Sequence, residues 1–117
     1  MGTDIHTIVQ IKKAGEWVTV VKNAADERNY ELFGLLAGVR GHDGPIEPLR
    51  GLPPGIEEIE GAEHSFTWYT LYELLCYGHY DLTDFVSEIM EAVEEAGEAG
   101  ETVEVYKNIR VVMGFDS

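Results

Sequence analysis

The sequence predicts an α+β fold, a two-layer sandwich with a mainly antiparallel sheet of three to four strands and about three helices on one face. Segments near both ends of the chain alternate apolar and polar residues with period two, which is typical of half-buried strands. A long segment between them repeats apolar residues with the helical period. The chain has 117 residues, 44% of them hydrophobic. This length fits a single acidic α+β domain over residues 1–117, large enough for one core.

The strands are expected at 4–12, 17–21 and 102–116. Residues 4–12 place Ile5 and Val9 on one face and His6 and Gln10 on the other. A short turn after Lys13 makes 17–21 a hairpin partner of the first strand. In the last segment an apolar set on one face alternates with a more mixed set on the other. The apolar set is Ile109, Val111, Met113 and Phe115, and the mixed set is Arg110, Val112, Gly114 and Asp116. A further short extended segment is predicted at 64–68.

Helices are expected at 30–39, at about 70–76 and at 83–96. Asn29 and Thr70 precede the first two and are suitable N-caps. The third has a clear apolar stripe and ends near Gly97. Residues 40–55 hold all four prolines of the chain and form a long loop, held in order by apolar anchors such as Leu52. Cys76 lies within the apolar pattern of the second helix and is expected in the core.

The formal net charge is −14, from 22 acidic residues against 8 lysines and arginines. Such a field repels DNA, RNA and anionic membranes, so neither direct nucleic-acid binding nor membrane binding is expected. The sequence contains no leader peptide and no long apolar run, and its only cysteine suits a reducing compartment. A cytoplasmic protein is therefore expected. The acidity suits a soluble surface, a basic partner or mimicry of nucleic-acid charge.

Candidate site residues lie on strands and loops of the first two thirds of the chain and on the last strand. If the first and last strands are neighbours, Asp4, His6 and Arg110 gather on one sheet face and can bind an anion. Arg28, Arg40 and Arg50 flank the first helix and the long loop, where they can converge on phosphate groups. A solvated sheet face with an incidental ion pair is the alternative for the first set. For the three arginines the alternative is surface pairing with Asp26, Glu31 or Glu47.

Little indicates catalysis or a cofactor. His42-Asp43 is a weak metal-ligand pair, and the histidines lack the helical spacing of a metalloprotease. No phosphate-binding or dinucleotide-binding motif is present, so no cofactor and no catalytic residue is predicted. Among the clustered aromatic residues, Trp68 can stack on a purine beside an arginine, although a place in the core is the alternative.

Several motifs resemble a family of small, largely uncharacterised bacteriophage and prophage proteins. They are Met1-Gly2-x-Asp4-Ile5-His6, Arg28-Asn29-Tyr30-x-Leu32-Phe33, Arg50-Gly51-Leu52-Pro53, His64-Ser65-x-x-Trp68 and the ending Arg110-x-x-x-x-Phe115-Asp116. Thr3 departs from the cysteine expected in many relatives. The resemblance implies a phage-encoded accessory protein in the host cytoplasm. It favours one ligand-binding site, made of Asp4, His6, Arg28, Asn29, Tyr30, Arg40, Arg50, His64 and Trp68, with Arg110 joining from the last strand.

Three functions remain open from the sequence. The first is capture of a small anionic or nucleotide-like ligand, such as a host immune signal. The second is an acidic DNA mimic that inhibits a basic host defence protein, in the manner of an anti-CRISPR. The third is a small metal-dependent hydrolase using Asp4, His6, His42 and Asp116. Self-association of the chain stays open beside all three.

Overall fold

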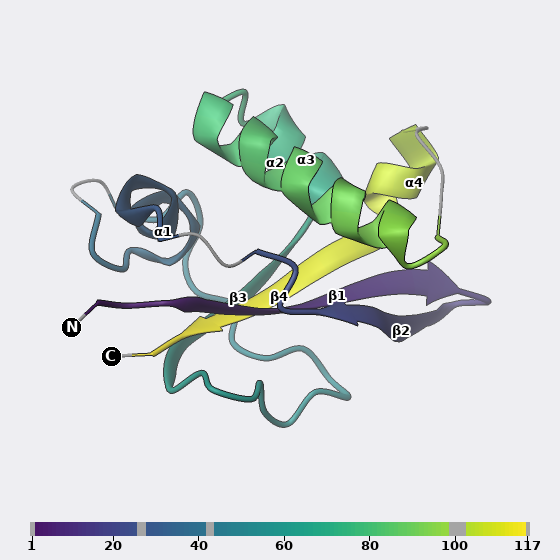
Figure 1. Cartoon of the computed structure of the whole chain (residues 1–117), viewed down its shortest axis with the longest axis horizontal. Coiled ribbons are helices and arrows are strands. Elements are labelled where there is room, and N and C mark those ends of the chain that lie inside the picture. Colours follow the sequence, from purple (N-terminus) through teal and green to yellow (C-terminus); the bar gives the residue numbers. More distant parts are fainter. Residues whose placement is uncertain (1, 26–27, 42–43, 99–102, 117) are drawn as a thin grey trace.

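The computed structural model describes residues 2–25, 28–41, 44–98 and 103–116, and it confirms the α+β fold (Figure 1). Four strands form one sheet in the order β2-β1-β4-β3, with every neighbouring pair antiparallel. The strands are β1 (Ile5–Lys13), β2 (Glu16–Lys22), β3 (His64–Thr70) and β4 (Ile109–Phe115). The helices are α1 (Tyr30–Ala37), α2 (Leu71–Cys76), α3 (Tyr80–Glu95) and α4 (Val103–Lys107).

The first and last strands pair in the middle of the sheet. Ile5 lies opposite Phe115, and the register runs without a break to Ile11 opposite Ile109. The two ends of the chain therefore lie side by side (Figure 1). Every residue of β4 is buried, because β4 lies between β1 and β3 and other side chains pack on both of its faces.

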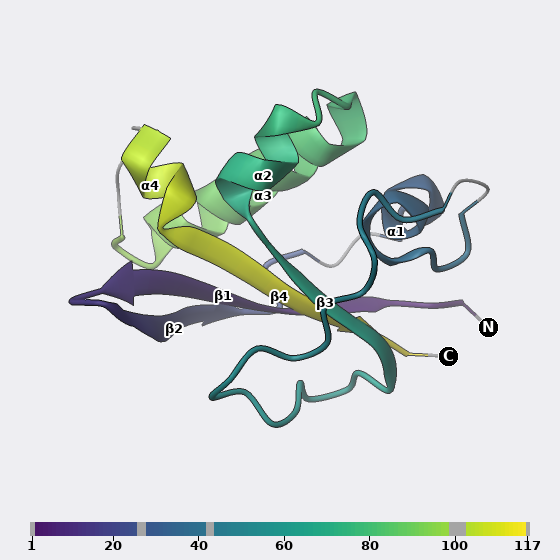
Figure 2. The same ribbon diagram turned by 180° about the vertical axis from the view of Figure 1, so that it is seen from behind.

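All four helices cover one face of the sheet, as Figures 1 and 2 show from opposite sides. The apolar stripes of α1 and α3 pack on Val9, Val111 and Phe115 in one continuous core. Local sequence sets the helix ends. Asn29 caps α1 by accepting a hydrogen bond from the Leu32 N–H at 3.0 Å, and Gly38 ends α1 in the left-handed conformation.

The opposite face is covered in part by the loop between α1 and β3, which lies below the sheet in Figure 1. This loop places Leu52, Ile56 and Ile59 against Ile8 and Val112 and makes a second, smaller core. The face beyond this small core, toward the β1–β2 turn, carries polar and aromatic side chains. That part of the sheet becomes important below.

Two expectations from the sequence are wrong. Residues 103–107 form a helix rather than the start of a strand extending from 102 to 116, because Val105 and Tyr106 cover the core from one helical turn. Residue 102 itself lies outside the described residues. Cys76 is exposed and not in the core, because the short α2 buries Leu71 and Leu74 and turns Cys76 away from them. Helix α3 also starts earlier than expected, at Tyr80, where His79 caps it.

In the described part of the chain no helix has the length and the apolar character that crossing a membrane requires.

Candidate functional site

The ten candidate residues lie in two separate groups. One group gathers where the two ends of the chain meet, and we call it the terminal cluster; it consists of Asp4, His6, Arg28, Asn29, Tyr30, Arg40 and His64, together with Thr3 and Asp116. The other group crosses the sheet face opposite the helices, and we call it the ladder: Trp17, Arg110, Trp68 and Arg50. The strands β1 and β4 are neighbours, which is the condition on which a shared anion site depended, but Arg110 lies opposite Gln10 and not opposite Asp4.

Asp116 is the centre of the terminal cluster. Its carboxylate accepts hydrogen bonds from the Asp4 N–H and from His6 Nε2, both at 2.9 Å. Its backbone oxygen lies 3.2 Å from His64 Nε2. Because His6 belongs to β1, His64 begins β3 and Asp116 directly follows β4, these contacts tie the ends of three strands together.

The arginines of the terminal cluster already have protein partners. Arg28 binds Asp4 through two hydrogen bonds, of 2.7 and 3.3 Å. Arg40 donates to the Thr3 hydroxyl at 3.0 Å and lies 5.5 Å from the centre of the Tyr30 ring. An anion entering here would have to displace Asp4 from Arg28, and the cluster is best described as a clasp between the chain ends.

The electrostatics of the terminal cluster agree with this description. The hydrogen bond from Arg28 lowers the pKa of Asp4. Hydrogen bonds from the Asp4 N–H and then from His6 lower the pKa of Asp116. Both carboxyl groups are therefore held as carboxylates by their neighbours.

The remaining members of the terminal cluster have local partners. The Asn29 side chain caps α1 and also donates to Asp81 at 3.3 Å. His64 Nδ1 lies 2.8 Å from the hydroxyl of Ser65, inside the bulge with which β3 begins. The structure places no set of three or more histidine, cysteine or carboxylate side chains at metal-binding distance within its described ranges. The weak pair His42-Asp43 lies outside those ranges.

The ladder alternates cationic groups with aromatic rings across three strands and a loop. The Arg110 guanidinium of β4 lies 4.3 Å from the Trp17 ring centre and 5.4 Å from that of Trp68. The Arg50 guanidinium lies 4.8 Å from the centre of the same Trp68 ring. These separations are typical of cation–π contacts, which stabilise by about 0.5–2 kcal/mol each depending on exposure.

Arg110 is the unusual member of the ladder. Its side chain is only 5% exposed, and burial lowers the pKa of its guanidinium. Among the residues that the structure describes, no carboxylate forms an ion pair with it. In a chain of net charge −14, this is a cation that the fold keeps away from acids.

A neutral side chain takes the place of the missing carboxylate. Gln10 is 6% exposed and accepts a hydrogen bond from Arg110 Nε at 2.8 Å, while its amide group donates to Thr19 at 3.2 Å. Within the described residues no buried side-chain nitrogen lacks a hydrogen-bond partner. Any terminal N–H of Arg110 without a protein acceptor therefore faces solvent, and it is available to an acceptor from outside.

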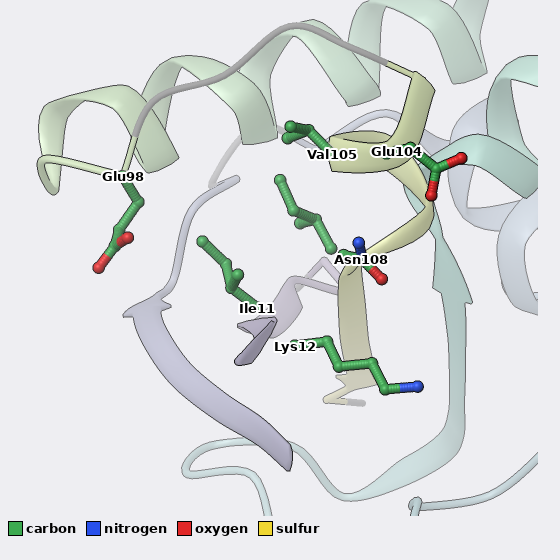
Figure 3. Close-up of a pocket in the computed structure, with 7 residues that line it drawn as sticks. Ile11, Lys12, Glu98, Glu104, Val105 and Asn108 are labelled. Carbon is green, nitrogen blue, oxygen red and sulfur yellow. The ribbon is translucent and has the colours of Figure 1, made fainter. Parts of the chain in front are cut away.

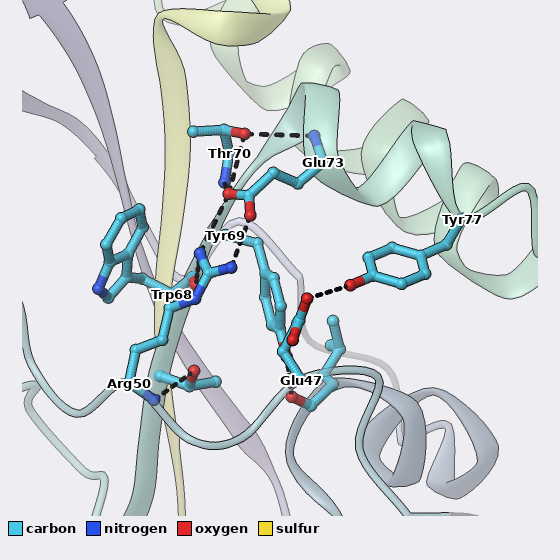
Figure 4. A network of polar contacts seen from close by, with 9 residues as sticks. Glu47, Arg50, Trp68, Tyr69, Thr70, Glu73 and Tyr77 are labelled. Carbon is cyan, nitrogen blue, oxygen red and sulfur yellow. Dashed lines mark hydrogen bonds and ion pairs between the residues drawn. The ribbon is translucent and has the colours of Figure 1, made fainter.

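Arg50, in contrast, is neutralised within the protein. It donates to both carboxylate oxygens of Glu73 at 3.0 and 2.6 Å and to the Trp68 carbonyl at 3.0 Å (Figure 4). Glu73 is also the third residue of the capping box of α2, bonded to Thr70. The bidentate pair therefore joins the loop, β3 and α2, and it fixes the outer end of the ladder.

Removing the charge of Glu73 tests this pair. Burial raises the pKa of Glu73, but the hydrogen bonds from Arg50 and Thr70 together lower it by more than burial raises it. The net shift of the Glu73 pKa is therefore downward. A lowered pKa gives stability that is present above the ordinary pKa and lost as the pH falls through the folded-state value. Glu73→Gln should therefore cost about 1 kcal/mol at neutral pH, with the pair discounted for its partial exposure, and much less near pH 3.

Urea denaturation of the wild type and of Glu73→Gln between about pH 7 and pH 3 would measure this difference. Glu91→Gln, on the exposed side of α3, is the control for general loss of acidity. A gap between wild type and Glu73→Gln that stays constant with pH would contradict the assigned pair.

A cavity of about 230 Å³ lies apart from both groups, between the end of the β1–β4 pair and α4 (Figure 3). Ile11, Val105 and Ile109 form its apolar part, and Lys12, Glu98, Glu104 and Asn108 also line it. Glu98 is paired with Lys13 at 2.7 Å, so the charges around the cavity are mixed. None of the ten candidate residues lines this cavity.

Sequence reasoning identified three of the four ladder residues and missed Trp17 together with its neighbour Gln10. The alternation of 4–12 already placed Gln10 on the face shared with His6. The hairpin pairing places Trp17 opposite Lys12, two positions from Gln10 on the same face. What the sequence lacked was the order of the strands, which brings β4 beside β1.

Comparison of the chain with models of protein families, with curated proteins and with solved structures finds no match. The resemblance to small phage proteins therefore stays a prediction. Function has to be inferred from the geometry of the terminal cluster and the ladder. Each holds an arginine with no carboxylate partner among the described residues, and of the two Arg40 is exposed whereas Arg110 is buried.

Proposed function

We propose that this protein binds a small anionic ligand that carries an aromatic ring, such as a nucleotide, on the ladder. The observation that supports this most is Arg110, a buried guanidinium paired with glutamine and not with a carboxylate. Keeping a cation out of water is unfavourable unless something compensates for it. An anion bound from solvent supplies that compensation, and hydrogen bonds of this charge-assisted kind are strong.

The rings beside Arg110 suit the other half of such a ligand. Trp17 and Trp68 are both partly exposed and are held in place by the cations next to them. Stacking of a base on an aromatic side chain contributes about 1–3 kcal/mol per base. A nucleotide can therefore place its phosphate at Arg110 and its base on one of the two rings, on an open sheet face.

The role that follows is capture without chemistry. A binding face of this kind sequesters a ligand and needs no catalytic group. In the setting implied by the resemblance, a phage-encoded accessory protein in the host cytoplasm would remove a nucleotide-like signal of the host's immune response.

Tryptophan fluorescence gives a direct test, because Trp17 and Trp68 are the only tryptophans in the chain and both lie in the ladder. Titration with AMP at low salt, excited at the red edge of tryptophan absorption, should change the emission in a saturable way. Adenosine and inorganic phosphate, each carrying half of the ligand, should bind more weakly than AMP. The proposal would be contradicted if millimolar AMP left the emission spectrum unchanged and calorimetry detected no heat of binding.

A second candidate is mimicry of nucleic-acid charge by the helix layer. The solvent side of α3 presents Asp84, Glu91, Glu94 and Glu95, all exposed and all on the side of the molecule away from the ladder. A row of carboxylates can engage a basic, DNA-binding host protein. Such binding would weaken steeply with salt and would survive substitution of Arg110, which separates it from ligand capture.

A further inference from the structure

The charge available at the ladder is small. Arg50 is balanced by Glu73 at 2.6 Å, which leaves Arg110 as the cation of the ladder without a carboxylate among the described residues. Lys12 adds a second positive charge nearby, with its ammonium 5.9 Å from the Trp17 ring centre. Lys12 is exposed, so water and salt screen its effect.

Exposed carboxylates lie on the strand and the loop next to the ladder, and among the described residues none of them forms an ion pair with Arg110 or Lys12. Glu16 directly precedes Trp17 in β2 and is exposed. Glu57, Glu58 and Glu60 are exposed on the loop whose apolar residues pack beside Trp68. A negative group that contacts Arg110 gains a local hydrogen bond. A further negative group on the same ligand extends past Arg110 and meets mainly this negative field.

Resting on the proposed function, we infer that the ladder selects its ligand by charge and takes nucleotides with a single phosphate in preference to di- and triphosphates. Phosphate monoesters and phosphodiesters of a nucleoside, cyclic nucleotides included, are the class that fits. The same feature keeps polynucleotides away, because each added phosphate brings a charge that no cation of the ladder neutralises. A chain of net charge −14 can therefore hold a nucleotide site, provided that the nucleotide carries only one phosphate.

Calorimetric titration with cyclic AMP, AMP, ADP and ATP, without divalent cations, tests this inference because the base is the same throughout. At low salt the affinity should fall at least tenfold from AMP to ATP. Added salt should weaken AMP binding, and the gap between AMP and ATP should narrow because the repulsion is screened.

A paired substitution locates the source of the repulsion. Glu57→Gln with Glu58→Gln should tighten ATP binding several-fold and change AMP binding little. Glu94→Gln with Glu95→Gln removes the same charge from the distant helix layer and should leave the ratio of the two affinities as it is. ATP binding as tightly as AMP at low salt would overturn the charge selection and leave ligand capture standing. Failure of every nucleotide to bind would instead overturn the proposed function.

Discussion

Replacing Gln10 with glutamate should weaken anion binding at least tenfold while leaving the fold intact. The new carboxylate would sit where the Gln10 amide accepts from Arg110 Nε at 2.8 Å, and it would neutralise the guanidinium from inside. Two opposite charges about 4 Å apart attract by roughly 4 kcal/mol at an effective dielectric constant near 20. We therefore expect the affinity for AMP to fall by at least a factor of ten, measured by calorimetry.

The stability of Gln10→Glu distinguishes this effect from simple disruption. Arg110 is already desolvated, so the substitution adds only the burial of one carboxylate, which the new ion pair offsets. The free energy of unfolding should stay within about 1 kcal/mol of the wild type. Ser87→Glu adds the same charge on the exposed side of α3 and should leave AMP binding nearly unchanged. Wild-type affinity in Gln10→Glu would show that Arg110 is not the anion site.

The largest loss of stability should come from Phe33→Ala. Phe33 is fully buried and meets the Phe115 ring edge-on at 5.1 Å between ring centres, which links α1 to the central strand β4. Truncating a buried phenylalanine to alanine costs about 3–5 kcal/mol, through lost transfer energy and the cavity left behind. Domains of this size have about 5–15 kcal/mol in total, so the variant should be marginally stable.

Urea denaturation followed by circular dichroism measures this loss as a lower midpoint at an unchanged slope. Phe33→Leu keeps most of the volume and should lose far less. Leu49→Ala removes an apolar side chain that is exposed and should change the midpoint little. A cost below about 1 kcal/mol for Phe33→Ala would mean that the core relaxes around the missing ring.

Much of the fold was predictable from the sequence because its patterns are local. The alternation in 4–12 and 109–115 specifies two faces for each strand, and the face that carries Ile5, Val9, Val111 and Phe115 lies in the main core. A smaller core with Ile8 and Val112 covers part of the other face, which the alternation alone does not predict. Residues 103–107 were wrongly predicted as part of a strand because Val103 and Val105 continue the strand-like alternation. Packing against the core favours one helical turn there instead. Cys76 misled in a similar way, since a helix of six residues buries fewer positions than its apolar composition implies.

The site was less predictable because it depends on register. The first and last strands are neighbours, but antiparallel pairing puts Asp4 beside Asp116 and leaves Arg110 opposite Gln10, six residues farther along. At about 3.3 Å per residue this separates the two groups by roughly 20 Å. The aromatic and arginine residues were rightly singled out, yet the neutral partner Gln10 carries no chemical signal of its own. The role of Gln10 as the neutral partner of Arg110 can be recognised only when the strand register is known.

The pairing of β1 with β4 also dictates when this protein can fold during its synthesis. Within the described sheet β4 is the only neighbour of β3 and separates it from the β1–β2 hairpin, yet it is the last of the four strands to leave the ribosome. Until residues 109–115 emerge, the nascent chain holds an isolated hairpin, helices with no sheet to cover and a β3 strand with no partner. Contacts between residues about a hundred positions apart then form in one late step. During translation the edges of β1 and β3 that will later pair with β4 stay exposed. We expect chaperones that shield unpaired strands to bind the unfinished chain at this stage.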